Sequence, residues 1–348
     1  MAPHLDLIRD NWTRGWQGGR DLLLTQTYRE HNLDKTGTVT VWKSTGTAWQ
    51  SQHLTSQNYA AGILYLLLYA QDEGIQMHYG SGQNWYSPTN KFAMKIYGRM
   101  DRVLGNASAD SRLLNYLQVD PSALPDGPEG VRVIRCTDNE LPMVKHMAQQ
   151  CRGKTFCRAE ELDVPDLGLD RLDMQYRRYG LGRKRYIWMA LDRKTHAPKG
   201  MLVAYRGPFG FNFSFLENRC DLMTDPFLTG EERAEVCRTL LRTAAPVYLA
   251  PGRKPHYPLS HLVVMADAAC TKALEPMGAV KTRQYYHGIW LEQGFEKWKK
   301  YMQRIFSPVI KRYEKKQITP PQARVPAAVP MPLPGMFQAP RAPEARPA

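Results

Sequence analysis

The same order of predicted elements occurs in two separate stretches of the chain, and this repetition limits the fold more than any other feature. The first stretch is predicted to contain two strands, a helix, a strand and a helix, at 38–42, 47–53, 58–73, 75–79 and 88–103. We base strands on apolar–polar alternation and helices on apolar side chains spaced three to four residues apart. Such an order predicts an α/β (α+β) fold with mixed, mostly antiparallel sheets flanked by helices.

Local signals define the elements of the second stretch. Its strands are predicted at 131–135, 186–192, 199–205, 211–219, 261–265 and 284–291. Thr137, followed by Glu140, has the spacing of a capping box and predicts a helix start. Thr229 is expected to cap another helix. Further helices are predicted at 231–245 and 268–276, and ahead of both stretches at 5–31.

Proline and glycine mark the expected domain boundaries. The segment 118–130 holds three prolines and two glycines and is predicted to be a linker. It separates an N-terminal lobe, 1–117, from a C-terminal lobe, 131–316, which ends in a basic helix. Residues 317–348 are rich in proline and alanine and are predicted to form a disordered tail.

Composition and charge restrict the class of protein. The net charge of +14 favours an anionic partner, such as nucleic acid, anionic lipid or a phosphorylated cofactor. The six cysteines form no Cys-x-x-Cys pair and stand near no histidine cluster, so we expect reduced thiols and no metal site. The apolar run at 60–70 is too short to span a bilayer, and the first residues lack a signal-peptide pattern. We therefore expect a cytoplasmic protein without a transmembrane segment.

A fixed spacing of residues recurs in the two stretches. In the first, the spacing is filled by Asn90, Ala93, Ile96 and Tyr97. In the second, the same offsets are filled by Asp267, Cys270, Ala273 and Leu274. The pattern resembles the Asn-x-x-Ala-x-x-Leu-Tyr motif of the GCN5-related N-acetyltransferase (GNAT) superfamily, which binds acyl-CoA. The Gly-Phe pair that follows in that family is lost in the first stretch. The resemblance implies a tandem, diverged repeat of the GNAT fold.

The family's other signature is Gln/Arg-x-x-Gly-x-Gly/Ala at the start of a helix. Small residues there let backbone N–H groups approach the pyrophosphate of CoA. The first stretch fits this signature, with alanine in place of the first glycine, at Gln57, Asn58, Tyr59, Ala60, Ala61 and Gly62. The second stretch lacks it, and Glu231 and Glu232 would repel a phosphate. We therefore expect acyl-CoA in the first lobe and none in the second.

A third segment, 177–182, also matches this signature, but a strand pattern follows it instead of a helix. It is predicted to be a turn. Its basic residues are candidates for an anion contact: Arg177, Arg178, Arg183, Lys184 and Arg185.

The resemblance also assigns chemical roles. In the family, an amine attacks the acyl thioester directly, a helix tyrosine protonates the leaving thiolate, and a carboxylate or water chain takes the amine proton. Tyr97 is the candidate acid, with simple core packing as the alternative. Glu217 is a candidate base, unless it forms a salt bridge with Arg219. His53 is the other candidate base, unless it is a surface histidine, and Asn90 is expected near the cofactor.

Two functions remain open on sequence alone. The first is an N-acyltransferase that moves an acyl group from acetyl-CoA or another acyl-CoA to a small-molecule or protein amine. The alternative is a non-catalytic module on a degenerate acetyltransferase fold, which recognises a nucleotide, nucleic acid or anionic lipid through basic patches. Partial loss of the motifs favours the alternative, whereas their order along the chain favours the transferase.

Overall fold

The structure is a computed structural model of the 348-residue chain and describes residues 4–29, 36–56, 60–126, 130–253 and 256–317. The chain divides into two compact units, Met1–Ser307 and Pro308–Ala348. Of the second unit only the helical residues 308–317 are described, and the account below concerns the first unit. Within the described residues, no helix is both long and apolar enough to cross a membrane.

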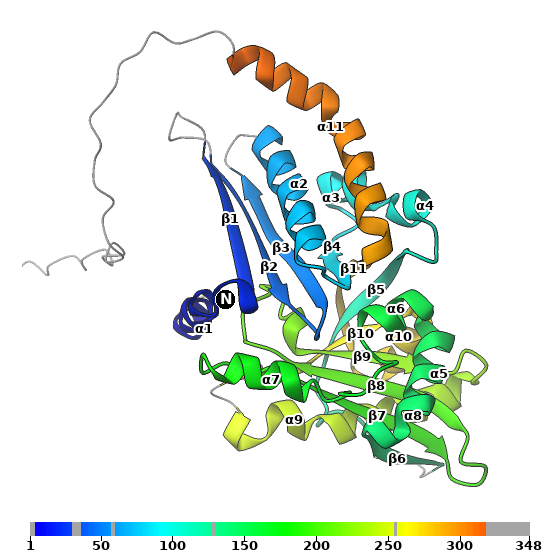
Figure 1. The fold of residues 1–348 in the computed structure, drawn as a ribbon. Coiled ribbons are helices and arrows are strands. Elements are labelled where there is room, and N and C mark those ends of the chain that lie inside the picture. Colours follow the sequence, from blue (N-terminus) through cyan, green and yellow to red (C-terminus); the bar gives the residue numbers. More distant parts are fainter. Residues whose placement is uncertain (1–3, 30–35, 57–59, 127–129, 254–255, 318–348) are drawn as a thin grey trace, which may run out of the picture. The chain divides into compact units, whose positions relative to one another are not determined.

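One mixed sheet of eleven strands forms the centre of this unit (Figure 1). In chain order the strands are β1 (Leu23–Arg29), β2 (Thr36–Lys43), β3 (Ala48–Ser56), β4 (Ser81–Tyr86), β5 (Ala109–Val119), β6 (Val131–Cys136), β7 (Lys184–Asp192), β8 (Pro198–Arg206), β9 (Arg219–Thr224), β10 (Leu262–Ala266) and β11 (Val280–Leu291). Their order across the sheet is β1-β2-β3-β4-β11-β5-β10-β9-β8-β7-β6. The pairs β3–β4 and β9–β10 are parallel, and the other neighbours are antiparallel.

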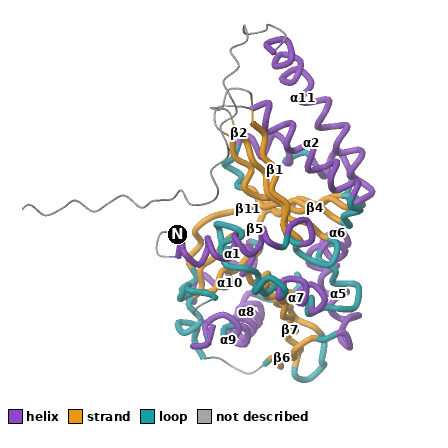
Figure 2. Tube along the Cα trace, turned by 60° about the vertical axis from the view of Figure 1, so that its left-hand side comes forward, coloured by secondary structure: helices purple, strands orange, loops and turns teal. Residues whose placement is uncertain are grey.

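Helices connect and cover the strands, as the colouring by secondary structure in Figure 2 shows. They are α1 (Leu5–Gln17), α2 (Ala60–Gln76), α3 (Lys91–Tyr97), α4 (Met100–Leu104), α5 (Leu141–Arg152), α6 (Lys154–Ala159), α7 (Asp170–Arg177), α8 (Gly230–Ala244), α9 (Pro246–Leu249), α10 (Ala268–Leu274) and α11 (Phe295–Gln317). The helix α2 joins the parallel strands β3 and β4, and α8, followed by the short α9, joins β9 and β10. Each parallel pair therefore has the helical crossover that parallel strands require.

The two halves of the sheet exchange strands. β5, from the first half of the chain, pairs with β10, and β11, from the second half, pairs with β4. β5 and β11 also pair with each other along nearly their whole length. This exchange makes one continuous sheet, so each half depends on the other for its last strand. The division into lobes at 118–130 stays a prediction.

Apolar cores lie on both faces of the sheet. Successive residues of β7 point to opposite faces, as a pleated strand requires. Trp188 and Ala190 belong to the core that includes α8. Ile187 and Met189 belong to the core that includes α5 and α6. Because both faces are covered, β9 and β10 are buried along their whole length.

Most predicted elements and both predicted caps are confirmed, although several boundaries differ. Thr137 and Thr229 each form a capping box, with Glu140 and Glu232. The predicted helix at 5–31 is wrong beyond Gln17, because residues 23–29 form β1 and pair with β2. The predicted strand at 75–79 is wrong: α2 continues to Gln76, and the strand begins at Ser81.

Two further corrections concern the middle of the chain. The helix predicted at 88–103 is divided into α3 and α4. The strand predicted at 211–219 is wrong, because residues 216–218 form a 3-10 turn and β9 begins only at Arg219. Phe215, with a φ of 61°, starts that turn. Within the segment 177–182, Arg177 ends α7 and the residues after it form a turn towards β7, as predicted.

Candidate functional site

The parallel strands β3 and β4 separate soon after they meet. They pair only at Ala48↔Ser81, Trp49↔Gly82 and Gln50↔Gln83, although β3 continues to Ser56 and β4 to Tyr86. On their outer sides both strands remain paired, with β2 and β11. The inner backbone edges of residues 51–56 and 84–86 therefore face a gap in the ladder. We call this feature the β3/β4 splay.

Buried polar side-chain atoms without partners gather on β3 and β4, two of them in the splay and two at the paired positions just before it. No described residue hydrogen-bonds to Gln50 Nε2, Ser81 Oγ, Asn84 Oδ1 or Trp85 Nε1. The backbone oxygen of Trp85 is reached by a side chain, since Gln52 Nε2 donates to it over 3.3 Å. Buried polar groups in folded proteins nearly always have partners, so four exceptions on two adjacent strands indicate a place that accepts hydrogen-bonding groups.

Tyr97 lies at the end of α3, inside an aromatic cluster. Its ring centroid is 5.7 Å from that of Tyr86, 6.0 Å from Trp290 and 6.1 Å from Trp298. The side chain is 7% exposed. Burial raises the pKa of the Tyr97 phenol, and a hydrogen bond with Asn84 lowers it in part. The phenol is therefore protonated near neutral pH.

An apolar pocket of about 40 Å³ borders the Tyr97 side chain. Its walls come from β3, β4, α2, β11 and the first turns of α11, which contribute Trp49, Gly82 and Trp298 among others. The side chain of Trp298 is only 1% exposed, so the first turns of α11 pack closely against the rest of the pocket wall. The space suits a small apolar group.

The remaining residues predicted for the first lobe are only partly described. Gln57, Asn58 and Tyr59 lie outside the described residues, and so does the side chain of His53. Residues 60–62 form the first turn of α2. Asn90 caps α3, since its Oδ1 accepts from the backbone N–H of Ala93 over 3.0 Å. Asn90 is exposed.

Glu217 lies in the turn before β9 and is fully buried. Its carboxylate forms an ion pair with Arg183. The alternative partner named from sequence, Arg219, is wrong, because Arg219 pairs with Asp221 and Glu160 instead. Arg183 and Glu217 are 34 residues apart in sequence, so local spacing does not indicate that they pair.

The five basic residues at 177–185 do not form one surface. Arg183 and Arg185 are buried, and the Arg185 guanidinium donates to backbone oxygens of Leu167 and Glu161. Arg177 pairs with Asp173, and Lys184 lies near Asp173 and Asp170. Arg178 is exposed. Arg185 occupies a buried position of β7, whereas Arg183 lies just before the strand and is buried by its contacts with Glu217 and the Ser44 oxygen.

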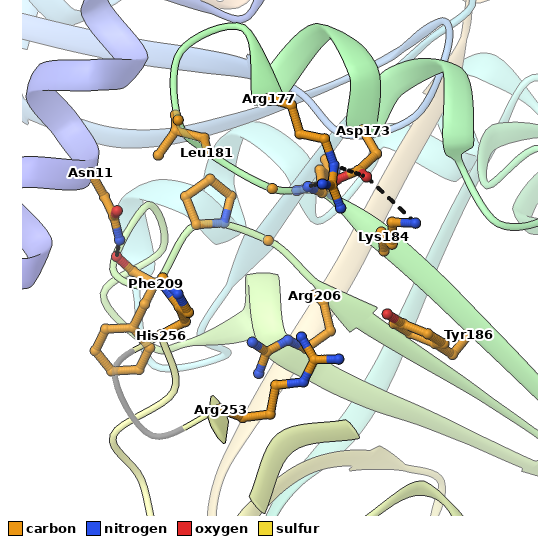
Figure 3. Close-up of a pocket in the computed structure, with 15 residues that line it drawn as sticks. Asn11, Asp173, Arg177, Leu181, Lys184, Tyr186, Arg206, Phe209, Arg253 and His256 are labelled. Atoms are coloured by element: carbon orange, nitrogen blue, oxygen red, sulfur yellow. Dashed lines mark hydrogen bonds and ion pairs between the residues drawn. The ribbon is translucent and has the colours of Figure 1, made fainter. Parts of the chain in front are cut away.

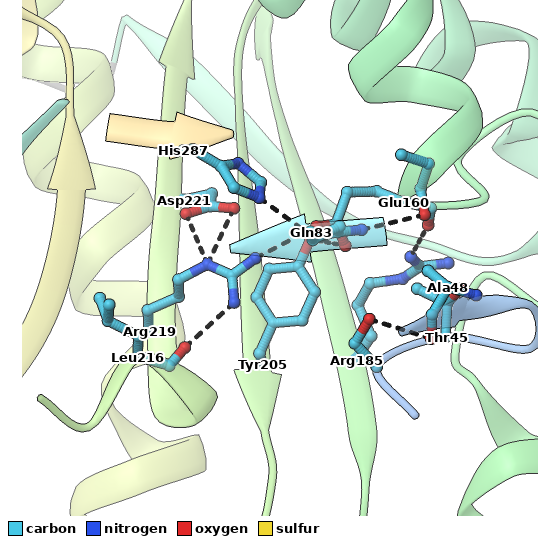
Figure 4. A network of polar contacts seen from close by, with 12 residues as sticks. Thr45, Ala48, Gln83, Glu160, Arg185, Tyr205, Leu216, Arg219, Asp221 and His287 are labelled. Carbon is cyan, nitrogen blue, oxygen red and sulfur yellow. Dashed lines mark hydrogen bonds and ion pairs between the residues drawn. The ribbon is translucent and has the colours of Figure 1, made fainter. Parts of the chain in front are cut away.

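A network of charged groups occupies the middle of the sheet (Figure 4). The Arg219 Nε donates to both oxygens of Asp221, over 3.0 and 3.2 Å, and its Nη1 donates to the Leu216 oxygen over 3.0 Å. Its Nη2 donates to Glu160 over 3.3 Å, and Glu160 also accepts from the Tyr205 hydroxyl over 2.8 Å. All three charged side chains are at most 2% exposed. A single guanidinium thus compensates two buried carboxylates.

His287 on β11 lies beside this network and contacts Gln83 and Trp85 of β4. Its Nδ1 lies 3.2 Å from a guanidinium nitrogen of Arg152, and its Nε2 lies 3.1 Å from Gln83 Oε1. Because a guanidinium can only donate, Nδ1 must accept, and the neutral ring carries its proton on Nε2. Gln83 Nε2 in turn donates to the Ala159 oxygen over 3.2 Å. The ring also stacks on Trp85, with centroids 4.0 Å apart.

We expect His287 to make stability depend on pH below neutrality. Burial, and then repulsion by Arg152 and Arg219, holds the pKa of His287 well below its ordinary value. The unfolded chain binds a proton near pH 6.5, whereas the folded chain does not. Stability is therefore fully present above about pH 6.5 and falls by about 1.4 kcal/mol per pH unit below it.

Urea unfolding of the wild type and His287→Gln between pH 7.5 and 5 checks this expectation. The difference in unfolding free energy between the two proteins should shrink as the pH falls, because glutamine does not titrate. A constant difference would mean that the pKa of His287 is the same in the folded and unfolded chains, which would contradict the expectation.

The second half of the chain has a similar parallel pair, but its helix start is occupied. β9 and β10 pair at three positions, from Val263↔Arg219 to Met265↔Asp221. At the start of α8, Glu232 accepts from both the backbone N–H and the hydroxyl of Thr229. A carboxylate thus takes the position where a phosphate would meet the helix dipole.

Comparison with known proteins finds similar chains among solved structures. No protein-family model and no curated protein matches the sequence. A Drosophila protein of a structural genomics programme aligns over 82% of this chain and 89% of its own, with 11% identity and a TM-score of 0.44. The tandem GNAT protein from the clavulanic acid biosynthesis pathway, solved without AcCoA, aligns over 81% and 87%, with 10% identity and a TM-score of 0.40.

A third solved structure is Saccharomyces cerevisiae N-myristoyltransferase with bound myristoyl-CoA. It aligns over 77% of this chain and 63% of its own, with 8% identity and a TM-score of 0.40. Likeness at this distance concerns the fold and not the reaction.

The topology of this chain agrees with the resemblance seen in its sequence. Each half has antiparallel strands that lead into a parallel pair, and in each half a helix crosses between the two parallel strands. The family resemblance predicts such a repeat, with a splayed strand ahead of the helix that follows it. The strand order therefore agrees with the GNAT-like arrangement that the sequence resemblance implies.

Proposed function

We propose that this protein is an acyl-CoA-dependent N-acyltransferase, with the pantetheine arm of acyl-CoA lying in the β3/β4 splay. The observation that carries the proposal is the separation of β3 and β4 after three residue pairs, beside four buried polar atoms without partners. A pantetheine arm is extended and has two amide groups. Each amide offers one donor and one acceptor, which is what an unpaired strand edge can bind.

The start of α2 supports the same placement. This helix follows β3 directly and has 17 residues, so its N-terminus provides a substantial helix dipole. Under the proposal, the CoA pyrophosphate lies against the backbone of Gln57, Asn58, Tyr59, Ala60, Ala61 and Gly62. The corresponding start of α8 carries the Glu232 capping box, so the proposal places acyl-CoA in the first half alone.

Acyl-CoA supplies the thioester, and the chain's own residues position the groups that react. The acceptor nitrogen attacks the thioester carbonyl, the C–S bond breaks, and the sulfur leaves as a thiolate. Tyr97 is proposed to donate its phenolic proton to that thiolate, for which its raised pKa keeps it in the protonated form. His53 is proposed to accept the proton of the attacking amine. The role of Glu217 as a base stays a prediction, since its carboxylate would first have to separate from Arg183.

The size of the pocket beside Tyr97 favours a short acyl group. About 40 Å³ accommodates an acetyl methyl group, whereas a long chain would require α11 to move. Acetyl-CoA is therefore the proposed donor.

Isothermal titration of the full chain with acetyl-CoA, octanoyl-CoA and CoA tests the proposal. We expect saturable binding of acetyl-CoA, and weaker binding of octanoyl-CoA because of the small volume of the pocket. Absence of heat at millimolar acetyl-CoA, together with no shift in melting temperature, would rule the proposal out. Pantetheine without the nucleotide should bind more weakly, because it lacks the pyrophosphate that meets α2.

A further inference from the structure

A second pocket is lined mainly by residues from the second half of the chain, and by none of the residues of the β3/β4 splay. Figure 3 shows its lining side chains. Its volume is about 610 Å³, within the range typical of small-molecule sites. Four parts of the chain that are distant in sequence line it. They are Asn11 of α1, the end of α7 with the turn into β7, the end of β8 with the residues after it, and the pair Arg253 and His256. The rings of Tyr186 and Phe209 line its walls.

The pocket is strongly basic, and only part of its charge is compensated. Arg183 pairs with Glu217. Asp173 is the one carboxylate among the lining residues, and it pairs with Arg177 over 2.6 Å and lies 3.5 Å from Lys184. These ion pairs account for three of the five cations that line the pocket.

The other two cations, Arg206 and Arg253, form no ion pair with any described residue. Their guanidinium groups lie beside each other in the pocket (Figure 3). Arg206 Nη1 is buried and has no hydrogen-bond partner among the described residues. Burial lowers the pKa of Arg206, and the nearby charge of Arg253 lowers it further. The Arg206 guanidinium lies 5.5 Å from the ring centroid of Tyr248, so an aromatic face offsets part of its charge.

We propose that Arg206 and Arg253 together bind the phosphate group of a small phosphate monoester in this pocket. Two adjacent guanidinium groups repel each other unless an anion lies between them, and each presents a planar fork that matches phosphate oxygens. A phosphate monoester carries nearly two negative charges near neutral pH, so it matches two unpaired cations better than a carboxylate does. The inference goes beyond the proposed acyl transfer and does not depend on it.

The shape of the pocket favours a small molecule over a nucleic acid. Phosphate contacts to a polymer are usually spread along an exposed surface, whereas here the unpaired cations face a concave pocket. Tyr186 and Phe209 provide apolar walls on which the rest of such a ligand can pack. Lys184 is 35% exposed and lies on the same pocket, where it can add a further contact.

Titration calorimetry and thermal melting of the full chain test this proposal, with glucose 6-phosphate and inorganic phosphate as probes at constant ionic strength. Both probes should bind and raise the melting temperature, while sodium acetate should not. Tighter binding of the ester indicates that the apolar walls contribute. Equal affinities support the phosphate site and limit recognition to the phosphate group.

Arg253→Gln is the decisive variant, with Arg132→Gln as the matched control, because Arg132 is an exposed arginine on β6, outside the pocket. Arg253→Gln should weaken binding of both probes at least tenfold, and Arg253→Lys should weaken it less. Without ligand, Arg253→Gln should melt at the same or a higher temperature, since it removes a repulsion. Arg132→Gln should bind both probes like the wild type.

The proposal is overturned if neither probe binds the wild type, if Arg253→Gln binds both probes as tightly as the wild type does, or if only single-stranded DNA binds. A markedly lower melting temperature of ligand-free Arg253→Gln would also count against it, since it indicates a structural role. Acetyl-CoA should bind equally to the wild type and to Arg253→Gln, so the failure of one proposal is distinguishable from the failure of the other.

Discussion

Replacing Arg219 with methionine is expected to lower the free energy of unfolding by about 3–5 kcal/mol. The guanidinium of Arg219 bonds to Asp221, Glu160 and the Leu216 oxygen, and it lies 4.0 Å from the ring centroid of Tyr205. Methionine fills much of the volume but leaves Asp221 and Glu160 buried without the guanidinium that pairs with both. The cost is therefore mainly that of uncompensated charge, and not that of lost packing.

Urea unfolding of Arg219→Met and of Arg132→Met measures this effect. The exposed Arg132 should change stability by less than about 0.5 kcal/mol. The double variant Arg219→Met with Asp221→Asn should recover part of the loss, because one of the orphaned charges is removed. A loss below about 1 kcal/mol for Arg219→Met would show that the network contributes little to folding.

Tyr97→Phe is expected to reduce kcat about 100-fold, with little change in KM for acetyl-CoA. The variant removes only the hydroxyl that is proposed to protonate the leaving thiolate, and the aromatic contacts to Tyr86, Trp290 and Trp298 remain. Because the phenol is needed only when the C–S bond breaks, binding of the donor should persist. The assay follows release of the CoA thiol with an amine acceptor.

Tyr116→Phe is the matched control for this variant. Tyr116 is also a buried tyrosine with a raised pKa, but it lies on β5 and has no proposed role in the reaction. It should retain wild-type kcat. Unchanged kcat in Tyr97→Phe would leave Tyr97 as a packing residue, the alternative that its low exposure also permits.

The order of helices and strands was largely predictable, because most elements have their own local pattern. The central strand β5 was not, although it pairs on both sides. Its residues 114–117 are buried in succession, which hides the alternation of a strand. Its partners β10 and β11 lie more than 140 residues later in the chain. The exchange of strands between the halves depends on this long-range pairing and has no local signal.

Residues of the candidate site were predictable from sequence only where they belong to a motif. Tyr97 and Asn90 were found by spacing, and the structure places Asn90 at the N-cap of α3 and Tyr97 at its last residue. The role of Glu217 depended on a strand that does not form, because Phe215 starts a turn there. His287 and Arg206 belong to no motif. Their importance comes from neighbours such as Gln83 and Arg253, which only the folded chain brings close.

Hydrogen–deuterium exchange with and without acetyl-CoA tests the central claim most directly, since it reports on backbone amides. If the pantetheine arm lies in the β3/β4 splay, exchange should slow in peptides that cover residues 51–56, 84–86 and the first turn of α2. Peptides that cover the start of α8 should not change. Protection confined to α8, or no protection of β3 and β4 at saturating acetyl-CoA, would contradict the account.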